Sequence, residues 1–140
     1  MYRRIFVPTD GSELSDQAVA HAGSLARSVG ARVILFHAMH FYATPALYGM
    51  MPESRNDADG HARELLEAAA KNDKLAGVNV TQEFVSSDFP AEAIVDAATA
   101  NQCDLIVMAS HGRRGMSALL LGSETQKVLT HSKIPVLIVR

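Results

Sequence analysis

The stretch Leu105-Ile-Val-Met108, followed by Ala109-Ser-His-Gly-Arg-Arg-Gly-Met-Ser-Ala-Leu-Leu-Leu-Gly-Ser-Glu-Thr125, decides the fold. Its first four residues are apolar and predict a buried strand. Gly112 and Gly122 are separated by nine residues, and Ser123 comes directly after the second glycine. Glycine lets a backbone come close to a ligand, and a helix that begins at Ser123 directs unpaired N–H groups toward this loop. A strand, a glycine loop and a helix N-terminus in this order predict an α/β protein with a phosphate-binding site.

Four more runs of apolar, often β-branched residues predict strands, and segments with helical spacing separate them. The five predicted strands are Arg4–Pro8, Arg32–Ala38, Asn79–Val85, Asp104–Ala109 and Pro135–Val139. The four predicted helices run from Ser12 to Gly30, from Ala58 to Ala70, from Pro90 to Ala98 and from Ser123 to Leu129. In the last of them, Ser123-Glu-Thr-Gln126 fits a capping box, which makes Ser123 the expected N-cap.

The alternation of strands and helices predicts one α/β domain over residues 1–140, with a doubly wound, five-stranded, mainly parallel sheet and helices on both faces. Ligands of such sheets bind beyond the carboxyl ends of the strands, where the strand order reverses. The segment Thr9-Asp-Gly-Ser12 follows the first strand, and the glycine loop follows the fourth. If those two strands are neighbours, as the fold class implies, both loops line one crevice.

The overall composition is that of a packed globular protein. The 140 residues are 48% hydrophobic and carry a formal net charge of −2, which gives no footprint for nucleic acid or an anionic membrane. No apolar run approaches the ~20 residues that span a bilayer, and no signal peptide is recognised. The single cysteine, Cys103, excludes an internal disulfide and fits a reducing compartment. We therefore expect a cytoplasmic protein in which Cys103 is a buried, inert thiol.

Four short motifs together resemble the universal stress protein family over essentially the whole chain. They are Val7-Pro-Thr-Asp-Gly-Ser12, Ser110-His-Gly-Arg-Arg-Gly115, Leu120-Leu-Gly-Ser123 and Pro135-Val-Leu-Ile-Val139. The resemblance implies a Rossmann-like fold of the adenine nucleotide α-hydrolase type. ATP-binding members carry G-x2-G-x9-G-[ST], and the matching positions here read Ala109-x2-Gly112-x9-Gly122-Ser123. The chain therefore resembles the ATP-binding branch more than the branch that lacks the glycines and binds no ATP.

The resemblance implies that ATP, or AMP or ADP, is bound, with Mg²⁺ bridging phosphate oxygens. The positions that it assigns are Pro8, Thr9 and Asp10 near adenine and ribose, Ala38 at the adenine edge, Met108 and Ala109 under the ribose, and Gly112, Gly122, Ser123 and Thr125 around the phosphates. The predicted site also includes His111, Arg113, Gly115 and Glu124. Alanine at position 109 matters if the family needs positive φ there, because ATP affinity is then reduced; if only a small side chain is needed, little changes.

Each of these signals also has a purely structural interpretation. Gly112 and Gly122 could form a tight turn and a helix entry without any ligand. Asp10 could organise the first loop or cap the first helix, and Arg113 could be solvated rather than paired with phosphate. The ligand interpretation is favoured because these features converge on one predicted crevice.

The motifs favour a nucleotide-responsive regulatory or stress-protection module over an efficient enzyme. Phosphoryl transfer needs a positioned Lys or Arg, a metal-binding carboxylate and a base, whereas the glycine loop lacks the G-K-[ST] ending of a P-loop. No nucleophile has an evident base, and the histidines lack metal-ligand spacing. A phospho-acceptor receiver domain is disfavoured because Asp10 has no acidic neighbour. At most slow ATP hydrolysis is expected; the alternative is a dimeric interaction module that binds no nucleotide.

Two further segments predict contacts with other molecules. Val136-Leu-Ile-Val139 predicts an apolar strand with no helix after it to cover a sheet edge. Unprotected edges invite pairing, so we expect a twofold homodimer through antiparallel pairing of this strand, and the family resemblance implies the same dimer. The irregular segment Phe41–Asp59, which holds tyrosines and methionines, predicts either a lid or partner contact or a plain surface loop.

Overall fold

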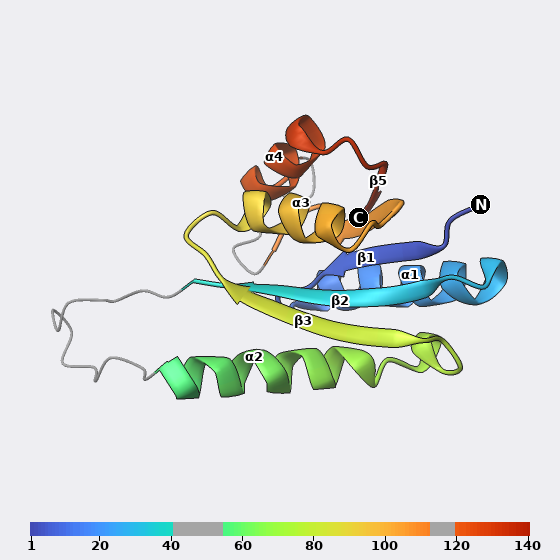
Figure 1. Cartoon of the computed structure of the whole chain (residues 1–140), viewed down its shortest axis with the longest axis horizontal. Helices are drawn as coiled ribbons and strands as arrows, with labels where there is room; N and C mark the ends of the chain where they lie inside the picture. The colour runs from blue at the N-terminus through green and yellow to red at the C-terminus, as the bar shows by residue number, and fades with distance from the viewer. Residues whose placement is uncertain (41–54, 113–119) are drawn as a thin grey trace, which may run out of the picture.

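The computed structural model describes residues 1–40, 55–112 and 120–140 (Figure 1). The elements in chain order are β1 (Arg4–Pro8), α1 (Glu13–Val29), β2 (Arg32–Met39), α2 (Arg55–Ala70), the short 3-10 helix η1 (Asp73–Leu75), β3 (Val80–Ser86), α3 (Pro90–Ala100), β4 (Leu105–Ala109), α4 (Ser123–His131) and β5 (Val136–Val139). All five predicted strands are confirmed, and each end lies within one residue of its expected position.

The five strands form one parallel sheet in the order β3-β2-β1-β4-β5. Strand β1 pairs with β2, where Ile5 lies opposite Val33, and with β4, where Ile5 lies opposite Leu105. The chain moves outward from β1 through β2 to β3, then crosses back to β4 and continues outward to β5. The strand order therefore reverses between β1 and β4, which confirms the predicted neighbours and puts a topological switch point at their carboxyl ends.

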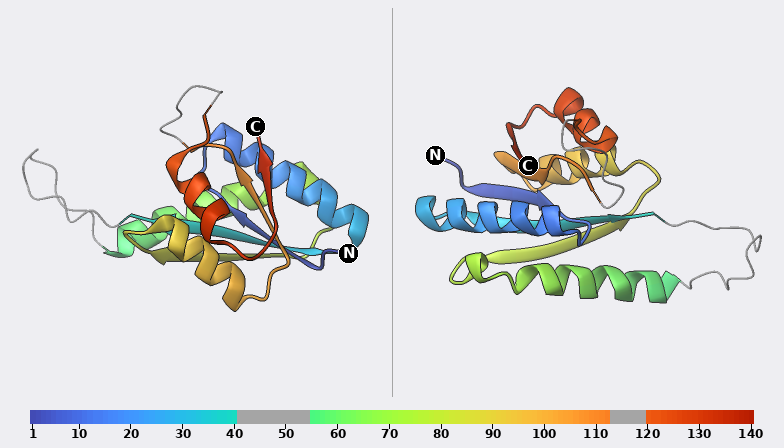
Figure 2. Two further views of the ribbon diagram at one scale, coloured as in Figure 1. Left: turned by 90° about the horizontal axis from the view of Figure 1, so that it is seen from above. Right: turned by 180° about the vertical axis from the view of Figure 1, so that it is seen from behind.

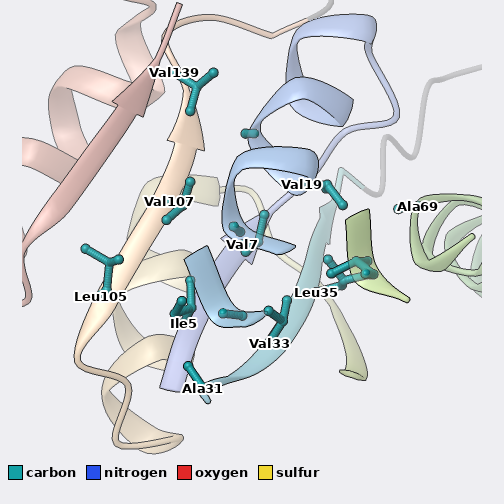
Figure 3. Close-up of a cluster of buried hydrophobic side chains, with 14 of the residues drawn as sticks. Ile5, Val7, Val19, Ala31, Val33, Leu35, Ala69, Leu105, Val107 and Val139 are labelled. Atoms are coloured by element: carbon teal, nitrogen blue, oxygen red, sulfur yellow. The ribbon is translucent and has the colours of Figure 1, made fainter. Parts of the chain in front are cut away.

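Helices cover both faces of the sheet because successive side chains of a strand point to opposite faces. Ile5 and Val7 belong to the core shared with α1 and α2, which Figure 3 shows in close-up. Phe6 belongs to the core shared with α3 and α4, where its ring centroid lies 5.1 Å from that of Phe36. Figure 2 shows the two helix pairs on opposite sides of the sheet. Burial of each such side chain contributes about 1.5–3 kcal/mol, so both layers fix the helices against the strand ends.

The helix boundaries follow local chemistry. Helix α1 begins and ends as predicted: the side chain of Ser12 accepts a hydrogen bond from the N–H of Ser15, and Gly30 ends the helix at φ 72°. Helix α2 begins at Arg55, so the prediction of an irregular segment up to residue 59 is wrong at its end. The first turn of α2 is polar, and the apolar periodicity that signals a helix starts only at Ala58. Residues 41–54 lie outside the described part of the chain.

The predicted capping box at the start of α4 is wrong. The N-cap is Gly122 (φ −61°, ψ 152°), whose carbonyl oxygen accepts the first helical N–H, that of Gln126, at 3.0 Å. The N–H of Gly122 donates to the carbonyl oxygen of Ser110 at 2.7 Å, which holds the glycine in this extended conformation. The Gln126 side chain donates to the carbonyl oxygen of Leu121 at 3.1 Å and closes no capping box. Ser123 is therefore the first helical residue rather than the cap.

Strands β3 and β5 are the edges of the sheet, and Cys103 lies just before the inner strand β4. Strand β5 is one edge, as predicted, and its Leu137 is 41% exposed. Cys103 is buried next to the start of β4, which confirms its predicted environment. Burial, followed by the negative charge of Asp104, raises the pKa of the Cys103 thiol to about 11. Among the described helices, none has the length and apolarity that crossing a bilayer requires.

Candidate functional site

A pocket of about 750 Å³ lies at the carboxyl ends of β1, β2 and β4, at the switch point of the sheet. Every predicted site residue in the described part of the chain lines this pocket: Pro8, Thr9, Asp10, Ala38, Met108, Ala109, His111, Gly112, Gly122, Ser123, Glu124 and Thr125. The other two, Arg113 and Gly115, lie outside the described residues. The fold thus brings together two loops that are about a hundred residues apart in the chain.

The turn between β1 and α1 is fixed by its own polar side chains. One carboxylate oxygen of Asp10 accepts the N–H of Ser12 at 2.9 Å. The Thr9 hydroxyl lies 3.0 Å from the hydroxyl of Ser15, and Gly11 takes the positive φ (77°) that the turn requires. The structural interpretation of Asp10 is therefore correct as far as it goes. The same carboxylate also lines the pocket, so the two interpretations do not exclude each other.

Gly112 is needed for space rather than for an unusual backbone conformation. A Cβ atom at this position would lie 2.6 Å from Oδ2 of Asp10, and the backbone of Gly112 does not have positive φ. The start of the glycine loop therefore packs directly against the carboxylate of the first loop. A side chain at position 112 would force the Asp10 carboxylate to shift.

Gly122 is equally confined, but by backbone atoms. Its Cβ would lie 3.2 Å from Cα of His111 and 3.3 Å from the carbonyl oxygen of Ser110. Ala109, which replaces the first glycine of the motif, lies in β4 opposite Val139. Its φ is not positive, so alanine meets no backbone strain there. The question that the sequence leaves open at this position is thus one of size and not of conformation.

The N-terminal turn of α4 faces the pocket. The first intrahelical hydrogen bond is donated by Gln126, so the N–H groups of Ser123, Glu124 and Thr125 have no acceptor within the helix. The aligned peptide dipoles add a partial positive charge at this end. The hydroxyl of Thr125 is buried and donates to the carbonyl oxygen of Ala109 at 3.0 Å, which joins the helix to the end of β4. This turn can therefore offer backbone N–H groups to an anion.

Glu124 has a structural task within the same turn. One carboxylate oxygen accepts the N–H of Ala91 at 3.0 Å, and the other forms an ion pair with Lys127 at 3.0 Å. Helix α3 has no side-chain cap of its own at Phe89, so Glu124 supplies it from the neighbouring helix. The carboxylate of Glu124 therefore joins α4 to α3, while its backbone N–H remains in the helix turn that faces the pocket.

A second wall of the pocket was not predicted from the sequence. It consists of the end of β2 and one face of α2, with residues His37, Met39, His40, Ala58, His61, Ala62 and Leu65. The α2 members are spaced by three and four residues and so share one side of the helix, which runs along β2 and β3 in Figure 1. Their spacing was visible in the sequence, but the same spacing predicts ordinary core packing. Only the position of α2 against β2 distinguishes the two.

Polar contacts also place two of the pocket histidines. Nδ1 of His37 lies 2.8 Å from the carbonyl oxygen of Thr9, and Nδ1 of His111 lies 3.1 Å from the hydroxyl of Ser110. In the described part of the chain, no group of three or more His, Cys, Asp or Glu side chains converges as a metal site. The polar groups of the described lining include backbone N–H groups, hydroxyls, imidazoles and the side chains of Asp10 and Glu124.

The chain is similar to known proteins over its whole length. The model of the universal stress protein family matches residues 1–140. A universal stress protein of Thermus aquaticus is 33% identical over 140 residues, which cover the whole of both chains. The structure of universal stress protein MJ0577 of Methanocaldococcus jannaschii superimposes with a TM-score of 0.83 at 31% identity, covering 99% of this chain and 96% of that one. A universal stress protein solved in complex with cAMP gives a TM-score of 0.75 at 27% identity and covers 99% and 97%. The chain belongs to the universal stress protein family.

Proposed function

We propose that this protein binds an adenine nucleotide, ATP in the first place, in the pocket at the β1–β4 switch point. The observation that carries the proposal is the pair of confined glycines, Gly112 and Gly122, beside the open N–H groups of α4. A Cβ at Gly112 would crowd the Asp10 carboxylate and a Cβ at Gly122 would crowd the backbone of Ser110 and His111, so the two glycines let the loops close around the pocket. The helix end beside them favours an anion. The relative solved with cAMP supports the class of ligand.

The chemistry of the lining suggests how the ligand lies. The phosphates occupy the space between Gly112 and the first turn of α4, where backbone N–H groups are available. The ribose lies beside Asp10, above Met108 and Ala109. The base reaches the end of β2 at Ala38 and the face of α2. A volume of about 750 Å³ falls within the roughly 300–1,000 Å³ of small-molecule sites. The predicted contacts of Arg113 and Gly115 belong to the same proposal.

The donor set fits a nucleotide better than it fits a metal-dependent catalyst. Because no cluster of metal ligands is found among the described residues, Mg²⁺ would be held mainly by phosphate oxygens and water, as is common for this ion. Efficient phosphoryl transfer needs a positioned base and charge-stabilising groups, and the described lining does not assemble them around Gly112. We therefore propose a nucleotide-responsive, stress-protecting module with at most slow hydrolysis.

We also propose that residues 1–140 form one domain and that the protein is a cytoplasmic homodimer. Strand β5 is an edge of the sheet, and its exposed Leu137 would be covered by antiparallel pairing with a second copy. Twofold pairing would leave the nucleotide pocket, at the carboxyl ends of the strands, accessible in each protomer.

Calorimetric titration tests the proposed function. Purified protein, stripped of nucleotide, is titrated with ATP in the presence and absence of Mg²⁺. We expect saturable binding at about one nucleotide per chain. Absence of binding in both conditions would refute the proposal and leave the dimeric interaction module as the function to test.

A further inference from the structure

The backbone ladder between β1 and β2 stops one hydrogen bond early, inside the pocket. The N–H of Thr9 still donates to the carbonyl oxygen of Phe36 at 2.8 Å. In a regular parallel ladder, the next bond runs from the N–H of Ala38 to the carbonyl oxygen of Thr9. That bond is not made: the Thr9 carbonyl oxygen lies 2.8 Å from Nδ1 of His37 instead. A side chain therefore takes the acceptor that the backbone would otherwise use.

The consequence for Ala38 follows from the alternation of a parallel strand. Met39 accepts from Ser87 on the β3 side, so the N–H and C=O groups of its neighbour Ala38 point to the β1 side. Among residues 1–40, 55–112 and 120–140, no backbone group bonds to them there. Ala38 thus presents one donor and one acceptor, side by side, at the wall of the pocket.

The hydrogen bond also fixes the chemistry of the His37 ring. A carbonyl oxygen can only accept, so Nδ1 carries the proton, and in the neutral ring Nε2 is an acceptor. The ring is half-buried and belongs to the pocket lining. It contacts Thr9 and is the chain neighbour of Ala38, and the proposed nucleotide would touch both segments.

We propose that His37 is the positioning residue of the base site. By holding the Thr9 carbonyl oxygen, it keeps the N–H and C=O of Ala38 open as a donor–acceptor pair for the edge of a heteroaromatic base with an exocyclic amine. A ring nitrogen of the base accepts from the Ala38 N–H, and the amine donates to the Ala38 carbonyl. This inference rests on the proposed nucleotide binding and adds the residue that shapes its base-recognising half.

Two substitutions separate the hydrogen bond from simple packing. His37→Asn retains a donor nitrogen close to the position of Nδ1, whereas His37→Phe retains a flat ring without any donor. His21→Phe, at an exposed position of α1, is the matched control. We expect His37→Phe to weaken ATP binding at least ~tenfold and His37→Asn to stay within about threefold of the unsubstituted protein. Circular dichroism melts verify that each variant is folded.

A ligand without a base separates a defect of the base site from a general structural defect, because only the general defect would weaken its binding. Inorganic tripolyphosphate is titrated while the amide resonances of α4 are followed by NMR. We expect His37→Phe to bind it as the unsubstituted protein does, within about twofold, because the loss is confined to the base site.

Several results would overturn the inference. They are unchanged ATP affinity in folded His37→Phe, an equal loss in His37→Asn, an equal loss for tripolyphosphate, and a neutral His37 ring protonated at Nε2 by ¹⁵N NMR. Unsubstituted protein that binds no ATP would instead refute the proposed function itself, and the base site with it.

Discussion

Replacing Gly122 by valine tests the phosphate-binding half of the pocket. Even a Cβ there would lie 3.2 Å from Cα of His111 and 3.3 Å from the carbonyl oxygen of Ser110, closer than the ~3.5–4.0 Å of ordinary contacts. Both neighbours are backbone atoms, so the loop must shift, and the two methyl groups of valine need further room. The shift strains the 2.7 Å hydrogen bond between Gly122 and Ser110 and moves the N–H groups of α4 with it.

The expected magnitude follows from one lost contact. A hydrogen bond to a charged group contributes about 1.5–3 kcal/mol, and 1.4 kcal/mol corresponds to a factor of ten in Kd. Gly122→Val should therefore raise the Kd for ATP at least ~tenfold in calorimetry. Gly60→Val is the matched control, because a Cβ at Gly60 in α2 meets nothing within 4 Å. A folded Gly122→Val protein with unchanged ATP affinity would refute the assignment of this loop.

Three more predictions concern the neighbouring glycine, the sheet edge and the thiol. Gly112→Ala should displace the Asp10 carboxylate, because its Oδ2 atom lies 2.6 Å from the new Cβ position. ATP binding should weaken about tenfold, while the midpoint of thermal unfolding stays close to normal. Unchanged affinity in calorimetry would contradict this prediction. Ile138→Pro should give monomers in light scattering. The carbonyl groups of residues 135 and 139 bond to β4, so the Ile138 N–H faces the open edge of the sheet, where proline would remove it. A persistent dimer would reject the β5 interface. The Cys103 thiol, with its pKa raised to about 11, should react with Ellman's reagent at pH 8 roughly 100-fold more slowly in the folded than in the denatured chain. Its contribution to stability is complete below about pH 9 and is lost as the pH rises through about 11, so Cys103→Ala should lack this part of the alkaline loss in denaturant unfolding.

The sequence predicted the layered fold because its signals are local. Buried strands such as residues 105–109 are short apolar runs between turn residues, and a helix such as α1 carries both of its caps in the sequence. The prediction that β1 and β4 are neighbours came from the rules of doubly wound sheets rather than from any particular residue. Those rules were sufficient to place Asp10 and Gly112 in one pocket.

What the sequence could not predict depends on tertiary contacts. Ser123 looked like an N-cap, but the hydrogen bond from Gly122 to Ser110 makes the glycine the cap. Glu124 is predicted as a site residue, but no local pattern indicates that its carboxylate also caps the neighbouring helix at Ala91. The wall formed by α2 and the bond from His37 to Thr9 join segments whose proximity no local pattern encodes.

An NMR titration with ATP tests the central claim most directly, because it locates the ligand as well as detecting it. Amide resonances of uniformly ¹⁵N-labelled, nucleotide-free protein are followed to saturation. We predict that the largest shifts fall on Asp10, Ala38, Gly112 and the first turn of α4, residues 123–125. Saturable shifts confined to another region, such as the β3 edge, or no shifts at millimolar ATP, would contradict the claim that the β1–β4 switch point is a nucleotide site.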